Sequence, residues 1–189
     1  MQRYWRSFAA LAALATACVL AASACSSSGD DGLPPRLSSF PTVNMTTLSP
    51  QQQRVITVLH QEFDAQPDES KYTEGENQPW CADFVSWVMR EAGIPLANPN
   101  SGSWRIPGVY TLEAYLKAQG RFRGPGYRPQ PGDIVMYDKP SKFGNHTNIV
   151  VAIDGDAVTT VGGNEPGHIA ARTQDTMADP GLIGYGVLA

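Results

Sequence analysis

The sequence predicts an α+β domain in which helices come first and pack on a small antiparallel β-sheet. Apolar residues recur at helical spacing up to about residue 118, whereas the apolar runs after Gly120 are short and separated by turn residues. Glycine and proline together make up 33 of the 189 residues. That share excludes a long-helix bundle or a coiled coil.

Three helices are expected in the first half of the domain, which begins at Ser49. Ser49 fits a helix N-cap, Pro50 suits the first helical position, and Gln52 closes a capping box. In the second helix the apolar stripe ends at Ala92-Gly93, where glycine stops it. The predicted helices cover about 50–64, 78–92 and 109–118.

Short strands are expected in the second half of the domain. Asp154-Gly155-Asp156 is typical of a hairpin turn and joins two apolar runs, which predicts an antiparallel pair. The predicted strands cover 134–137, 146–153, 157–161 and 183–188.

Residues 1–24 are interpreted as a signal peptide rather than as part of the fold. Arg3 and Arg6 precede an apolar run of small residues, and the arginines stay on the cytoplasmic side, so we expect the rest of the chain to be exported. The run ends in Ala-Ser-Ala-Cys at 22–25, which resembles the lipobox of bacterial lipoproteins. This resemblance implies a lipid on Cys25 that attaches the protein to the outer face of the cell membrane. Plain secretion and an uncleaved membrane anchor are the alternatives.

The stretch from 25 to 48 is rich in serine, proline and glycine, and it predicts a flexible tether between the lipid and a domain that covers 49–189. The formal net charge is −4, and removal of residues 1–24 would take away two arginines and no acid, leaving −6. This balance argues against a nucleic-acid partner. The sequence does not fix the oligomeric state, and a monomer is our expectation.

Cys81 is the thiol that remains once Cys18 leaves with the signal peptide and Cys25 carries the lipid. It lies on the apolar stripe of the second helix, so one interpretation is a small core residue. It also lies in the first helical turn, just after Pro79, where unpaired N–H groups and the helix dipole stabilise a thiolate. The second interpretation is a nucleophile.

A thiolate nucleophile needs a base and a group that orients the base. Of the three histidines, His60 and His168 suit a helix edge and a solvated loop, whereas His146 begins an apolar strand that would hold it rigidly. Asn164 follows the next strand and is the nearest polar residue for the orienting role. Strand alternation would place Glu165 on the opposite face if the strand continues, but the double glycine at 162–163 is able to end it.

Four segments resemble, in order, the landmarks of the CHAP domain, a family of cysteine, histidine-dependent amidohydrolases and peptidases related to the NlpC/P60 enzymes. The resemblance implies a papain-like fold and cleavage of amide bonds in peptidoglycan, either the N-acetylmuramoyl-L-alanine bond or bonds within the peptides. By position it implies Cys81 as nucleophile, His146 as base and Asn164 as polar partner. The segments are WCADFVSWV (80–88), PGDIVMYD (131–138), HTNIVVAI (146–153) and TTVGGN (159–164).

Two positions depart from this resemblance. Many CHAP domains have glutamate where this chain has Gly162, and glycine where it has Asn148. These departures motivate an alternative hypothesis, a cell-wall-binding or scaffold domain of the same fold with weak or no catalysis. For an enzyme, we expect Gln78 as a second oxyanion donor and a substrate groove lined by Trp80, Trp104 and Asn148.

Some CHAP domains bind calcium near the nucleophile. Glu74, Glu76 and Asp83 supply carboxylates in that region, but the sequence has no acidic loop with ligands at alternate positions. We therefore expect these residues to be solvated acids, and we expect no metal and no other cofactor.

Overall fold

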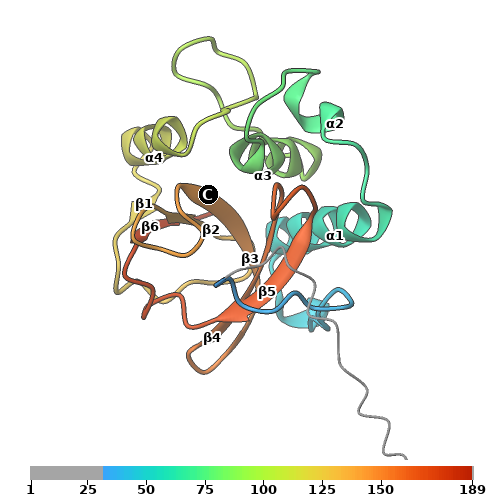
Figure 1. Cartoon of the computed structure of the whole chain (residues 1–189), viewed down its shortest axis with the longest axis vertical. Coiled ribbons are helices and arrows are strands. Elements are labelled where there is room, and N and C mark those ends of the chain that lie inside the picture. Colours follow the sequence, from blue (N-terminus) through green and yellow to red (C-terminus); the bar gives the residue numbers. More distant parts are fainter. Residues whose placement is uncertain (1–31, 189) are drawn as a thin grey trace, which may run out of the picture.

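A six-stranded antiparallel sheet with helices packed on it forms the framework, which confirms the α+β class (Figure 1). The structure, a computed structural model, describes residues 32–188. The strand order in the sheet is β1-β6-β2-β3-β4-β5, and every neighbouring pair is antiparallel. The strands are β1 (Phe122–Arg123), β2 (Ile134–Tyr137), β3 (His146–Asp154), β4 (Ala157–Gly162), β5 (Ala170–Gln174) and β6 (Leu182–Gly186).

Most of the expected elements are present. The capping box at Ser49 and Gln52 is formed, and the helix that it begins continues to Ala65. Short elements without a strong apolar pattern were not predicted, and these are η1, α2, β1 and β5. The helices are a 3₁₀ turn η1 (Met45–Thr47), α1 (Pro50–Ala65), α2 (Ser70–Thr73), α3 (Cys81–Glu91) and α4 (Val109–Ala118).

Helix α3 is the central helix of the molecule. Every residue from Cys81 to Met89 is buried, and α3 contacts α1 and α2 as well as β3 and β4 of the sheet. Each fully buried apolar side chain contributes about 1.5–3 kcal/mol to folding, so α3 is held firmly in place. Within residues 32–188 no helix combines the length and the apolar character needed to cross a membrane.

The N-terminal segment, which we define as residues 32–48, lies against the domain (the blue ribbon beside β5 in Figure 1). Leu37 donates its amide hydrogen to the carbonyl of Ala171 on β5 at 2.8 Å. Phe40 stacks on the ring of His60 at a centroid distance of 4.4 Å. The expected tether therefore differs from the structure over 32–48, because apolar residues spaced along this segment find partners on α1 and β5. Residues 25–31 and the signal peptide lie outside the described residues.

Candidate active site

Cys81 occupies the first residue of α3 and is 5% exposed. Its helix has no side-chain cap, and its first backbone N–H groups have no partners within the helix. The positive end of the helix dipole thus lies at the sulfur, where it favours a thiolate. The sequence-based placement of Cys81 in the first turn is confirmed.

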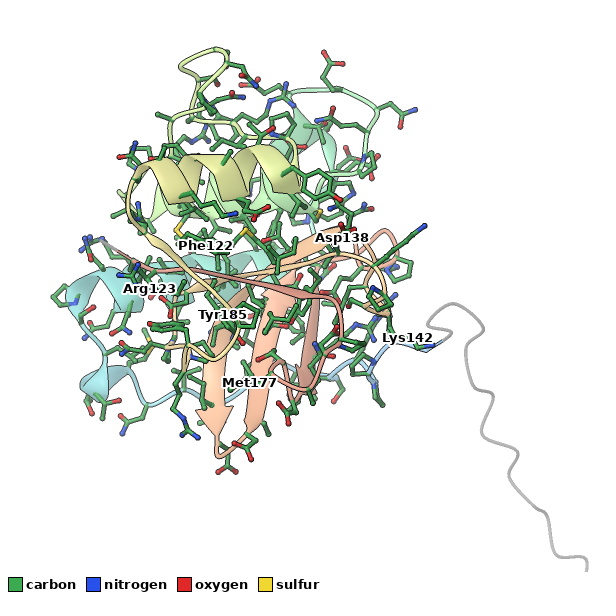
Figure 2. The ribbon with its side chains drawn as sticks, turned by 90° about the vertical axis from the view of Figure 1, so that its left-hand side faces the viewer. Phe122, Arg123, Asp138, Lys142, Met177 and Tyr185 are labelled. Atoms are coloured by element: carbon green, nitrogen blue, oxygen red, sulfur yellow. The ribbon has the colours of Figure 1, made fainter. Side chains whose placement is uncertain are left out.

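His146 is the first residue of β3 and is 6% exposed. Its ring stacks on Phe143 at 5.4 Å and 9°, and Phe143 in turn stacks on Tyr137 of β2. Because Tyr137 is also the register partner of His146, two adjacent strands fix the imidazole. Figure 2 shows Asp138 at the boundary between the helices and the sheet. Asp138 directly follows Tyr137, the register partner of His146, so His146 also lies near this boundary.

The packing of α3 on β3 brings Cys81 and His146 within hydrogen-bonding reach. The Nε2 atom of His146 lies 3.5 Å from Oε1 of Glu165, which is an ion-pair distance rather than a well-formed hydrogen bond. Nδ1 is therefore the ring nitrogen that remains for Cys81. Burial alone would lower the pKa of His146, but interaction with Cys81 and Glu165 raises it to about 10.

The side chain beside Nε2 of His146 is the carboxylate of Glu165, and not the amide of Asn164 that the strand alternation favoured. Strand β4 ends at Gly162, and Asn164 adopts a left-handed backbone conformation with φ of 60°. The chain therefore turns before Glu165, and the alternation of an extended strand does not apply there. Glu165 is the candidate site residue that the strand alternation had placed on the wrong face.

Arg172 on β5 holds the other side of this carboxylate. Its Nε donates to Oε2 of Glu165 at 2.6 Å, and both side chains are almost completely buried. A charge-assisted bond of this length in a dry environment fixes the carboxylate strongly. Glu165 thus bridges a guanidinium on β5 and the imidazole on β3.

The two positions that depart from the CHAP resemblance fit each other. A Cβ atom on Gly162 would lie 1.8 Å from Oδ1 of Asn148 and 2.7 Å from Oε1 of Glu165. The Asn148 amide therefore fills the space beside Gly162, while the carboxylate reaches the same place from Glu165. The loss of a glutamate at 162 does not leave the site without a carboxylate.

The residues expected to line a substrate groove are buried or partly buried. Trp80 is buried and stacks on Tyr72 at 5.3 Å, and Asn148 is fully buried beside Gly162. Trp104 is partly buried under the guanidinium of Arg90 at 4.1 Å. The expectation that Trp80 and Asn148 face an open groove is therefore wrong, because both fill space in the core.

Gln78 lies near the start of α3, where the sequence placed it, but its amide is engaged. Nε2 of Gln78 donates to Oδ2 of Asp83 at 2.9 Å, and Oδ1 of Asp83 lies 3.2 Å from Arg105. Arg105 also lies 3.2 Å from Glu74, so a guanidinium binds two of the acids that were considered as metal ligands. Burial raises the pKa of Asp83, whereas the bonds from Gln78 and Arg105 act in the opposite direction.

Comparison with known proteins agrees with the resemblance seen in the sequence. Residues 73–164 match the CHAP domain family, whose members are generally hydrolytic amidases or peptidases. The match includes Cys81, His146 and Asn164 and ends directly before Glu165. No curated protein matches the chain.

Proposed function

We propose that this protein is a thiol hydrolase that cleaves amide bonds of peptidoglycan, with Cys81 as nucleophile, His146 as base and acid, and Glu165 as the group that positions His146. The observation that carries the proposal is the buried row of Cys81, His146 and the Glu165 carboxylate. A thiol at a helix start opposite an imidazole on a strand is also what a papain-like arrangement requires. The CHAP match supplies the substrate class.

The resting state is proposed to be an ion pair between the Cys81 thiolate and the His146 imidazolium. With a pKa of about 10, His146 retains its proton at neutral pH, and the carboxylate of Glu165 stabilises the positive ring. The helix dipole and the unpaired amides at the start of α3 stabilise the thiolate.

In the first half of the reaction, the thiolate of Cys81 attacks the carbonyl carbon of the scissile amide and a C–S bond forms. The negative charge moves to the carbonyl oxygen. His146 then gives its proton to the amide nitrogen, the C–N bond breaks, and the amine leaves. A thioester on Cys81 and a neutral imidazole remain.

In the second half, His146 takes a proton from water, and the hydroxide attacks the thioester carbon. The C–S bond breaks, the carboxylic acid product leaves, and the thiolate–imidazolium pair is restored. The backbone N–H groups at the start of α3 are placed to stabilise the oxyanion in both halves. Gln78, whose amide nitrogen has a second hydrogen besides the one given to Asp83, is proposed as a further donor.

We also propose that the chain is exported and lipidated at Cys25, and that it works at the outer face of the cell membrane without a metal or another cofactor. The basic start, the apolar run and the Ala-Ser-Ala-Cys sequence support this placement. Peptidoglycan is then the polymer within reach of the domain.

The test is digestion of purified peptidoglycan by the full chain in detergent, with the released fragments identified by mass spectrometry. Replacement of Cys81 by alanine removes the nucleophile and should lower release to about 0.1% of the wild-type rate or less. His146→Ala should lower it similarly, whereas His168→Ala, which removes an exposed side chain, should leave the rate unchanged.

Equal release by wild type and Cys81→Ala would contradict the proposal. Binding of peptidoglycan by the wild type without any release would favour the alternative, a wall-binding domain. The chemical ends of the fragments identify the bond, because an amidase frees the lactyl carboxylate of the muramic acid and an endopeptidase frees ends within the peptide.

A further inference from the structure

The N-terminal segment and the active site meet at Arg172. One nitrogen of the guanidinium, Nε, binds Glu165 at 2.6 Å, and another, Nη1, donates to the backbone carbonyl of Pro34. Arg172 is 0% exposed and is the largest fully buried side chain in the described part of the chain. A buried guanidinium needs acceptors for its donors, and the N-terminal segment supplies one of them.

The backbone of the same segment is paired with β5. Residue Arg36 forms an antiparallel bridge with Arg172, and Leu37 donates to the carbonyl of Ala171 at 2.8 Å. Strand β5 is the last strand of the sheet, so this pairing covers an edge that would otherwise be open. The pairing fixes the carbonyl of Pro34 in front of the guanidinium.

The start of the segment also lies beside the loop that leads to His146. A Cβ atom on Gly32 would be 3.3 Å from Cδ of Lys142, and Figure 2 shows Lys142 beside the beginning of the described chain. The next residue in this loop, Phe143, carries the ring that stacks on His146. The segment thus adjoins Lys142, the residue before the stacked ring, and Arg172, the residue that holds the carboxylate.

We infer that residues 32–37 are a positioning element of the active site, which holds Arg172 so that the carboxylate of Glu165 is fixed against His146. This inference rests on the proposed function, because it assigns the segment a role in preparing the Cys81–His146 pair. The titratable groups that act on His146 are Cys81 and Glu165, and Arg172 is the charged group that holds Glu165. The segment that leads to the lipid is therefore part of the catalytic apparatus.

The test is the pH dependence of the alkylation of Cys81 by iodoacetamide in the full chain in detergent, followed on the Cys81 peptide by mass spectrometry. Leu37→Pro removes the N–H that binds Ala171 and should release the segment. We expect the pH midpoint of alkylation to rise by about one unit and the rate at neutral pH to fall about tenfold.

Ser39→Pro is the matched control, since it puts proline in the same segment at an exposed residue whose amide makes no hydrogen bond within residues 32–188. It should leave the midpoint unchanged. Faster hydrogen exchange of residues 32–37 and of β5 verifies the release in Leu37→Pro. Arg172→Lys, which keeps the charge but loses the planar fork, should raise the midpoint in the same way.

If residues 32–37 have only a structural role, Leu37→Pro and Arg172→Lys should lower the unfolding temperature without moving the pH midpoint of alkylation. This result would overturn the inference and leave the proposed function standing. If Cys81 of the wild type reacts no faster than the thiol of the denatured chain, the proposed function fails and the inference fails with it.

Discussion

Two buried glutamates in this molecule are held in different ways. Glu62 on α1 is 5% exposed, and Lys71 lies 2.7–2.8 Å from both of its oxygens while the hydroxyl of Tyr72 donates to it at 2.5 Å. Glu165 is 2% exposed and binds Arg172 through one oxygen, whereas its other oxygen faces His146 at 3.5 Å and makes no hydrogen bond. The first carboxylate is satisfied, and the second is only half satisfied.

This difference is the one expected between a structural cluster and the reactive cluster that we propose. Five buried side-chain atoms in residues 32–188 lack a hydrogen-bond partner, and three of them, on His146, Asn148 and Glu165, lie together at the site. An unsatisfied buried polar group costs about 1–3 kcal/mol. Folding tolerates such a cost where a ring has to gain and lose a proton during catalysis.

The comparison is tested most strongly by the same substitution in both clusters. Glu165→Gln should lower the rate of peptidoglycan hydrolysis per folded molecule about 100-fold, because His146 loses the charge that orients its ring and stabilises its protonated form. Glu62→Gln should leave that rate within about twofold. Both variants should be less stable, because each removes the charge of a buried carboxylate that is paired with a cation.

The measurement is the initial rate of fragment release, divided by the folded fraction from circular dichroism at the same temperature. If Glu62→Gln lowers the normalised rate as much as Glu165→Gln does, then the two clusters do not differ in function and the comparison fails.

A second prediction concerns the fit between Gly162 and Asn148 beneath Glu165. Gly162→Ala puts a methyl group 1.8 Å from Oδ1 of Asn148 and should lower the free energy of unfolding by about 1–3 kcal/mol. Adding Asn148→Gly to Gly162→Ala removes the clashing amide and should recover a large part of the lost free energy of unfolding. Denaturant unfolding of the wild type, the two single variants and the double variant measures this recovery. Additive losses in the double variant would show that the two side chains do not share this space.

A third prediction concerns the alkaline limit of activity. Glu165 helps to raise the pKa of His146 to about 10, so the wild-type rate should fall as pH rises through about 10 and the imidazolium loses its proton. Removal of the negative charge in Glu165→Gln destabilises the imidazolium, lowers the pKa of His146, and should move this limit down by about one pH unit. Initial rates between pH 6 and 11 measure the limit, which Glu62→Gln should not move.

The elements with strong local signals were predictable from the sequence. The capping box at Ser49 marks the start of α1, and the run from 109 to 118 predicts α4 at its observed bounds. Cys81 could be placed in the first turn because Pro79 and the apolar stripe indicate the start of α3, although the helix was expected from about 78 and begins at Cys81. His146 could be placed because it begins an apolar strand.

Glu165 and the N-terminal segment could not be predicted, because long-range contacts decide both. Strand alternation fails after Gly162, where the left-handed conformation of Asn164 turns the chain. Asparagine tolerates this conformation better than most residues, so the double glycine followed by asparagine was the available signal. The composition of 32–48 is that of a linker, and only its contacts with β5 and α1 hold it against the domain.

The docked N-terminal segment would also limit where the proposed hydrolase can work. Cys25 and Gly32 are seven residues apart in the sequence, so a lipid on Cys25 could stand at most about 25 Å from the point where the chain meets the domain. A tether that ran freely to residue 48 would reach much farther and let the domain turn in any direction. On the short connection, the side of the domain where Gly32 meets Lys142 would stay close to the lipid bilayer, and cleavage would be confined to the peptidoglycan layer nearest to the membrane.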